Sequence, residues 1–126
     1  AAIALKGVKV IGMDSAPSSI QDAKQTIQRH TLSMEVRKTN ADKFEAGDAF
    51  FDVAVLDPPR KGCSGVISEL QITRPKAIIY VSCNPNALKK DLKEAKKFGY
   101  TPHRVTVFDM FPHTHHVETL VELRRS

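Results

Sequence analysis

The sequence lacks the long apolar run that a membrane-spanning helix needs, and no signal-peptide pattern opens it. It has only two cysteines, Cys63 and Cys83, in different segments, which argues against a secreted disulfide scaffold. Free thiols in a reducing cytosol are the better interpretation, so we expect a cytoplasmic protein with no membrane segment. An initiator methionine is also missing, which suggests a fragment or a processed product.

A chain of 126 residues is long enough for one compact domain with a single core. Its hydrophobic share of 41% and charged share of 26% are those of an ordinary globular protein. No internal repeat or linker divides it, so we expect one domain over residues 1–126, with no prediction of its oligomeric state. The net charge of +5 suits a polyanionic partner such as RNA, although many basic proteins bind no nucleic acid.

Strand-like and helix-like segments alternate along the chain. β-rich or alternating apolar residues predict strands at residues 8–13, 34–36, 51–56, 76–81, 105–107 and 117–123. Helical apolar spacing and end signals predict helices near residues 17–27, 64–73 and 85–98, with Ser15 as the expected cap of the first. This order favours a mostly parallel α/β sheet. The connection 109–115 is too short for a crossover helix, so the final strand is expected to run antiparallel to its neighbour.

Polar side chains follow four successive predicted strands, and ligands gather at the carboxyl ends of strands in open α/β sheets. These side chains are Asp14, Asn40 with Asp42, Asp57, and Cys83 with Asn84. An acid in this place is also a common cap or turn former, so Asp14 alone does not decide the matter. Four such strand ends together favour a small-molecule site.

The first of these acids, Asp14, has the place of a carboxylate that accepts the ribose hydroxyls of an adenosine cofactor. Dinucleotides are held in the same way, so the acid does not identify the cofactor. A glycine-rich loop ahead of this strand is absent. Residues 1–6 are interpreted as the tail of the helix after that loop, so the chain is expected to begin just beyond the first cofactor-binding motif.

Cys83 lies where a predicted buried strand turns into a helix, with Asn84 as the expected cap and Pro85 as the first helical residue. A thiol at a helix N-terminus experiences partial positive charge, which favours the reactive thiolate. The alternative is a buried structural cysteine. Position alone does not choose between the two.

Three motifs, at residues 57–62, 82–85 and 109–118, resemble in order and spacing those of the RNA 5-methyluridine methyltransferase family. This family includes uracil-5-methyltransferases of bacterial ribosomal and transfer RNA, and the resemblance spans essentially the whole chain. It implies a Rossmann-like class I methyltransferase fold, here without the first strand and the glycine-rich loop. It also implies S-adenosylmethionine as cofactor and RNA as substrate.

The resemblance further assigns roles to residues. Cys83 would be the nucleophile that adds to carbon 6 of uracil, and Glu118 the base that removes the carbon 5 proton. Spacing alone does not separate Glu118 from a solvent-facing residue such as Glu122. Cofactor contacts would come from Asp14 at the ribose, from Asn40 or Asp42 at the adenine, and from Asp57 at the methionine end.

Two further groups of residues have competing interpretations. Arg60 and Lys61 either meet RNA phosphate or the flipped uridine, or are a solvated loop pair. His113, His115 and His116 resemble a metal cluster, but no cysteine or carboxylate set at zinc spacing accompanies them, so no metal is expected.

The reaction expected is methylation of carbon 5 of a uridine, in 23S ribosomal RNA rather than transfer RNA, because residues 57–63 look most like the ribosomal members. A transfer RNA uracil-5-methyltransferase is the alternative within the family. A cytosine-5-methyltransferase that uses Cys63 is an alternative within the fold, since Cys63-Ser64-Gly65 resembles part of its motif. An RNA-binding module without activity is the alternative from another class.

Overall fold

The computed structural model describes residues 9–31, 33–39, 50–109 and 117–125. The chain divides into two compact units, Ala1–Lys43 and Phe44–Ser126. That both units form one domain stays a prediction. Across the described ranges no helix is both long and apolar enough to cross a membrane.

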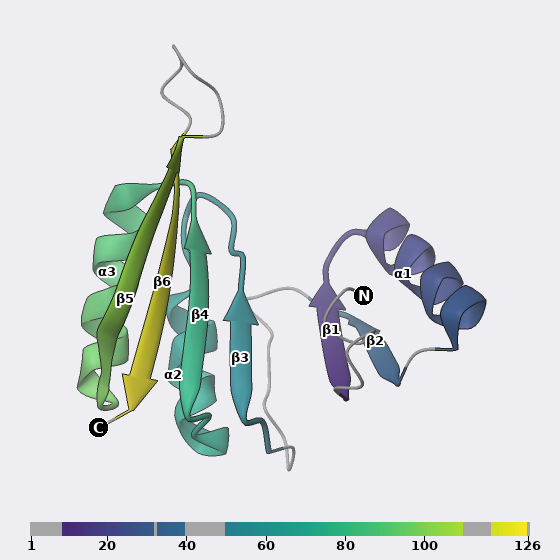
Figure 1. Cartoon of the computed structure of the whole chain (residues 1–126), viewed down its shortest axis with the longest axis horizontal. Coiled ribbons are helices and arrows are strands. Elements are labelled where there is room, and N and C mark those ends of the chain that lie inside the picture. The colour runs from purple at the N-terminus through teal and green to yellow at the C-terminus, as the bar shows by residue number, and fades with distance from the viewer. Residues whose placement is uncertain (1–8, 32, 40–49, 110–116, 126) are drawn as a thin grey trace. The chain divides into compact units, whose positions relative to one another are not determined.

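The first unit is a strand–helix–strand motif (Figure 1). Strands β1 (Val10–Asp14) and β2 (Met34–Lys38) pair in parallel, with Val10 opposite Met34 and Asp14 opposite Lys38. Helix α1 (Pro17–His30) connects them, as a parallel pair requires. The helix begins with Pro17 after Ala16 in the N-cap position. The prediction of Ser15 as the cap is therefore wrong.

The second unit is a four-stranded sheet with two helices. Its elements are β3 (Val53–Leu56), α2 (Ser64–Thr73), β4 (Ala77–Ser82), α3 (Pro85–Lys97), β5 (Tyr100–Asp109) and β6 (Val117–Arg125). The strand order is β3-β4-β6-β5. Strand β6 runs antiparallel to both β4 and β5, whereas β3 and β4 are parallel. The predicted parallel strands with an antiparallel final strand are thus confirmed.

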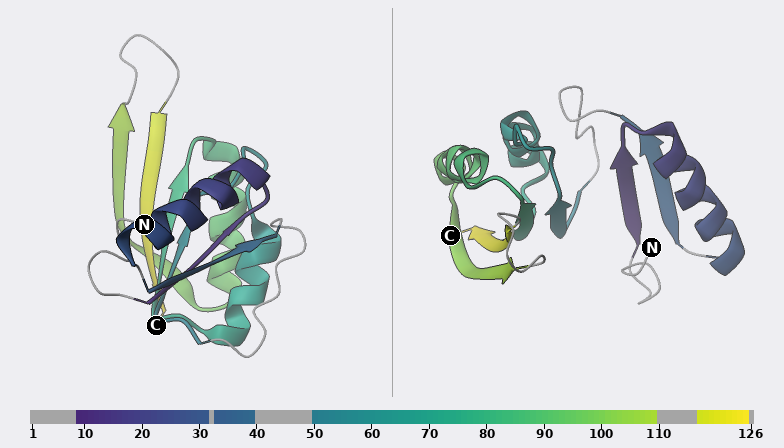
Figure 2. Two further views of the ribbon diagram at one scale, coloured as in Figure 1. Left: turned by 90° about the vertical axis from the view of Figure 1, so that its right-hand side faces the viewer. Right: turned by 90° about the horizontal axis from the view of Figure 1, so that it is seen from above.

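Helices α2 and α3 cover the same face of this sheet, as the view from above shows (Figure 2). The core lies between them, with Ile67 from α2, Ala95 from α3, Ile78 from β4 and Leu123 from β6 each at most 1% exposed. Full burial of an aliphatic side chain of the size of Ile or Leu stabilises a fold by about 1.5–3 kcal/mol. This packing fixes both helices against the strands, and with them the loops that join helices to strand ends.

Candidate active site

The ends of β3 and β4 bring two of the predicted site residues to one edge of the sheet. Leu56, the last residue of β3, is opposite Tyr80 of the parallel strand β4. Asp57 follows Leu56, and Cys83 follows Ser82 at the end of β4, so both residues leave the sheet at the carboxyl edge. Both are exposed.

Cys83 is a free, exposed cysteine in the short turn between β4 and α3. Asn84 is the N-cap of α3, and its side chain accepts a hydrogen bond from the backbone N–H of Asn86 at 3.1 Å. Pro85 is the first residue of the helix, so the predicted cap and first position are confirmed. The exposure of Cys83 rules out the alternative of a buried structural cysteine.

Ser82 and Asn84 hold the turn on either side of the cysteine. The Ser82 hydroxyl donates to the Asn84 carbonyl at 3.0 Å, and the Asn84 backbone N–H donates back to the Ser82 Oγ at 3.1 Å. Ser82 is itself only 5% exposed. The backbone on both sides of Cys83 is therefore fixed by paired polar groups, which suits a side chain that must be presented in one geometry.

The turn at Cys83 is tied to the loop that follows Asp57. The side-chain amide of Asn84 donates to the backbone carbonyl of Arg60 at 2.7 Å. Within the loop, the Gly62 N–H donates to the Pro59 carbonyl at 2.9 Å. This hydrogen bond thus connects two sequence motifs whose bonded residues lie 24 positions apart. The side chains of Arg60 and Lys61 are exposed on this loop.

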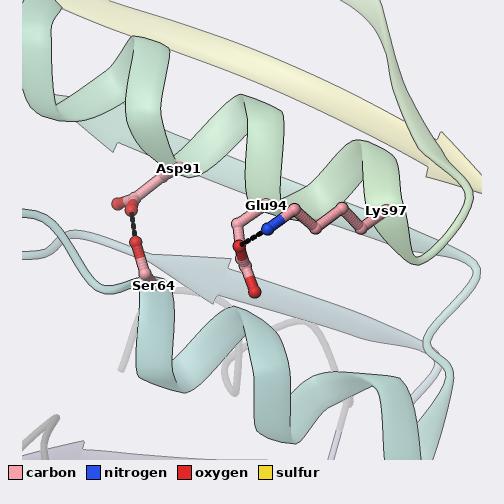
Figure 3. Close-up of polar contacts among 4 residues, drawn as sticks. All are labelled: Ser64, Asp91, Glu94 and Lys97. Atoms are coloured by element: carbon pink, nitrogen blue, oxygen red, sulfur yellow. Dashed lines mark hydrogen bonds and ion pairs between the residues drawn. The ribbon is translucent and has the colours of Figure 1, made fainter.

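A buried carboxylate, Asp91 of α3, anchors the end of the same loop. It is 1% exposed and accepts hydrogen bonds from the Cys63 N–H at 2.7 Å, the Ser64 hydroxyl at 2.5 Å and the Tyr80 hydroxyl at 2.5 Å. Figure 3 shows its contact with Ser64 at the start of α2. Because Asp91 is the acceptor of both the first groups of α2 and a side chain of β4, it fixes α2, α3 and the sheet relative to one another.

Sequence reasoning missed Asp91, although the sequence carries a signal for it. Asp91 lies among Leu88, Leu92 and Ala95 on the face of the helix that the apolar spacing predicts to be buried. A charged residue on such a face needs buried partners, because an unpaired buried charge is costly. The aspartate therefore indicates a buried polar network in advance, but not which groups compose it.

Cys63, the second thiol, differs sharply from Cys83. It is 6% exposed and lies in the core at the N-cap of α2. Burial first, and then the neighbouring charge of Asp91, raise the pKa of the Cys63 thiol to about 12. Since the thiolate is the nucleophile, a thiol held neutral and out of solvent is a poor one. This argues against the cytosine-5 alternative.

Glu118 lies at the same edge of the sheet as Cys83. The register of β4 and β6 pairs Ser82 with Thr119, so Cys83, which follows Ser82, and Glu118, which precedes Thr119, both lie just beyond this pair at the same sheet edge. Glu122, by contrast, is opposite Ile79 in the middle of β4. A hydrogen bond from Arg124 at 2.8 Å lowers the pKa of Glu122. The structure thus separates two glutamates that spacing alone leaves equivalent.

The remaining predicted cofactor residues fall outside the second unit. Asp14 is exposed at the carboxyl end of β1, and its Oδ1 accepts the Ala16 N–H at 2.8 Å, which is the turn-forming role common for an acid at a strand end. Asn40 and Asp42 lie outside the described residues, as do His113, His115 and His116.

Comparisons with known proteins support one family. The family model of tRNA (uracil-5-)-methyltransferases matches residues 9–126. An uncharacterized RNA methyltransferase from Bacillus cereus is 38% identical over 136 aligned positions, covering 98% of this chain and 28% of the relative. One from Oceanobacillus iheyensis is 38% identical over 134 positions, covering 96% of this chain and 28% of the relative. The chain therefore spans less than a third of the length of these curated relatives.

Solved structures show the same fold. The Pyrococcus abyssi tRNA (uracil-54, C5)-methyltransferase, solved with S-adenosyl-L-homocysteine, is 31% identical with a TM-score of 0.84, covering 96% of this chain and 30% of that one. The magnesium protoporphyrin IX methyltransferase of Synechocystis PCC 6803 is 17% identical with a TM-score of 0.73, covering 99% of this chain and 63% of that one. The second likeness concerns the fold alone. The predicted Rossmann-like class I methyltransferase fold is thereby confirmed.

Proposed function

The chain belongs to the tRNA (uracil-5-)-methyltransferase family, and from that premise we propose that it is the catalytic part of an enzyme that methylates carbon 5 of a uridine in RNA. The observation that carries this proposal is the position of Cys83. It is an exposed thiol at a strand end, at the same sheet edge as Glu118, and its turn is joined through Asn84 to the loop after Asp57. A cytoplasmic location is part of the proposal.

The reaction needs a nucleophile because carbon 5 of uracil is weakly nucleophilic by itself. The Cys83 thiolate adds to carbon 6, and the resulting enolate makes carbon 5 reactive toward an electrophilic methyl group. After methylation Glu118 takes the proton from carbon 5, the double bond re-forms, and the bond between carbon 6 and the Cys83 sulfur breaks. The thiolate is thereby regenerated. S-adenosylmethionine, when bound, supplies the methyl group.

The residues at the strand ends suit that cofactor. Asp57 is exposed, and within the described ranges its carboxylate has no hydrogen-bond partner, so it can accept from the ammonium of the methionine end. Asp14 uses one oxygen for the Ala16 N–H and keeps the other for a ribose hydroxyl. Asn40 or Asp42 would serve the adenine.

The target is proposed to be 23S ribosomal RNA, because the amino-acid sequence of residues 57–63 resembles that of the ribosomal members of the family. Transfer RNA is the second candidate, and it is favoured by the similarity to a tRNA methyltransferase from Pyrococcus abyssi. Arg60 and Lys61, exposed on the loop beside the Cys83 turn, are proposed to contact the RNA in either case.

Methyl transfer in the intact protein tests this function. With S-adenosylmethionine labelled in its methyl group, we expect label in 5-methyluridine from 23S RNA transcripts, and none after Cys83→Ala. Cys63→Ser is the matched control and should retain the product. Label in 5-methylcytidine would favour the cytosine-5 alternative, and label only in transfer RNA would correct the target. If the isolated chain binds RNA but calorimetry shows no binding of S-adenosylmethionine, the alternative of an RNA-binding module without activity is favoured for this chain.

A further inference from the structure

A groove on the second unit lies between helix α3 and the edge strand β5. Its floor is apolar and is formed by Pro85, Leu88 and Leu92 of the helix and Pro102 of the strand. Three lysines of α3, Lys89, Lys93 and Lys96, line it as well, and all three are exposed. The groove begins at Pro85, two residues after the nucleophile Cys83.

The charge of these lysines is not compensated by the helix. Of the two acidic residues of α3, Asp91 points into the core toward Ser64, and Glu94 forms an ion pair with Lys97 at 3.0 Å (Figure 3). Within the described part of the chain, Lys89, Lys93 and Lys96 have no ion-pair partner, and no acidic residue lines the groove. The groove therefore presents three positive charges in a row above an apolar floor.

The spacing of the lysines suits an extended polyanion. They lie at positions i, i+4 and i+7, which places them along one side of the helix over about 10 Å. A groove lined with positive charge follows the backbone of an unpaired strand, while its apolar floor contacts the carbon faces of riboses and bases. The lining residues include no aromatic side chain for base stacking, so we expect binding through phosphate contacts, which carry no base specificity.

We propose that this groove binds the unpaired RNA strand that flanks the target uridine, with Lys89, Lys93 and Lys96 against its phosphates. The proposal rests on the function given above, because the groove starts where the uridine would meet Cys83. A uridine must leave its stack to reach such a thiol, so a neighbouring stretch of strand has to be held apart from its partner. The groove gives that stretch a place on the side of the site formed by α3.

The affinity of the full chain for a fluorescein-labelled, unpaired 12-nucleotide RNA tests the proposal. The variant in which Lys89, Lys93 and Lys96 are all changed to Gln should bind at least about tenfold more weakly at physiological salt. Its plot of log affinity against log salt should lose about 2 in slope, since each phosphate contact to a single strand contributes roughly 0.7. The triple change to Arg keeps the charge and should keep both the affinity and the slope.

The matched control changes Lys24, Arg29 and Lys76 to Gln. These residues are exposed, lie outside the groove and carry the same total charge. The control should bind as the unaltered chain does. The proposal would be overturned by equal losses of affinity in both Gln variants or by unchanged affinity in the groove variant. It would also be overturned if the groove variant lost binding to anionic phospholipid vesicles but kept its binding to RNA.

Covalent complex formation distinguishes an error in the groove proposal from an error in the proposed function. In the intact protein, the groove variant retains Cys83 and should still form a covalent complex with 5-fluorouridine RNA, but at about tenfold higher RNA concentration. If complex formation is half-maximal at the same RNA concentration as in the unaltered protein, the groove proposal is wrong and the function stands. If the unaltered protein forms no complex, the function itself is wrong.

Discussion

The side-chain amide of Asn84 donates a hydrogen bond to the backbone carbonyl of Arg60 over 2.7 Å, which joins the turn at Cys83 to the loop after β3. The same side chain caps α3 through the N–H of Asn86. One residue therefore holds the turn at Cys83, starts the helix and positions the loop that begins at Asp57. This concentration of roles makes Asn84 the first residue to test.

Replacing Asn84 with Ala removes the cap and the link to Arg60 together. We expect the free energy of unfolding to fall by about 1–2 kcal/mol in urea titration, since a lost N-cap costs about 1 and a lost hydrogen bond about 1. The methylation rate should fall by more than this loss of stability explains, because the turn at Cys83 is no longer hydrogen-bonded to the loop. Asn86→Ala is the control, since only the backbone N–H of Asn86 takes part in the cap. Equal effects of the two changes would contradict the role of Asn84.

Gly62 is required by both its backbone and its neighbour. Its φ is +85°, and a Cβ atom there would lie 2.6 Å from the Oδ2 of Asp91. Gly62→Ala should therefore destabilise by more than about 1 kcal/mol, because the left-handed backbone is strained and the buried carboxylate has to move. Gly65→Ala in helix α2 meets no atom within 4 Å and should be neutral or stabilise by up to about 1 kcal/mol. Thermal melts of the two variants should shift in opposite directions or differ clearly in size.

The two thiols should react at very different rates. At pH 8 iodoacetamide is expected to modify Cys83, which is exposed, and to leave Cys63 unmodified until the chain unfolds. Burial and the charge of Asp91 raise the pKa of Cys63 from 9.0 to about 12. The unfolded chain therefore loses this proton first, and the stability that Cys63 contributes is present below pH 9 and is lost as the pH rises toward 12. Modification of Cys63 in the folded protein at pH 8 would contradict this picture.

Glu118→Gln tests the proposed base. Without a carboxylate to take the carbon 5 proton, turnover should fall by about 10²–10⁴-fold, and a covalent complex with ordinary uridine RNA should accumulate on denaturing gels. Glu122→Gln is the matched control on the same strand, because Glu122 is already paired with Arg124 and lies opposite Ile79. It should keep turnover within a few-fold of the unaltered protein. Loss of activity in the Glu122 variant alone would indicate that Glu122, and not Glu118, is the base.

Local features of this chain could be predicted from its sequence. The helix at Ser64–Thr73 and the Asn84–Pro85 start of α3 were predictable because apolar spacing and capping act within one or two turns. Ser15 was wrong as a cap because the helix begins one residue later, at Pro17, with Ala16 in the N-cap position and its N–H donated to Asp14. The choice between two adjacent helix starts depends on backbone geometry that the sequence does not specify.

Features that depend on distant pairing could not be predicted. The sequence indicates that β6 is antiparallel, but not that it lies between β4 and β5 and so brings Glu118 to the same sheet edge as Cys83. Likewise Asp91 is recognisable as a charge on an apolar helix face, whereas its partner Cys63 lies 28 residues away. Both arrangements arise from tertiary packing, which overrides local preference.

The central claim is that Cys83 forms the covalent bond to the uracil. The most direct measurement is mass spectrometry of the peptide that carries the RNA adduct after the intact protein reacts with 5-fluorouridine RNA and S-adenosylmethionine. Fluorine at carbon 5 leaves no proton for Glu118 to remove, so the bond to sulfur persists. The account predicts an adduct on the peptide that contains Cys83 and none after Cys83→Ala. An adduct on the peptide that contains Cys63, or one that survives in the Cys83→Ala variant, would contradict it.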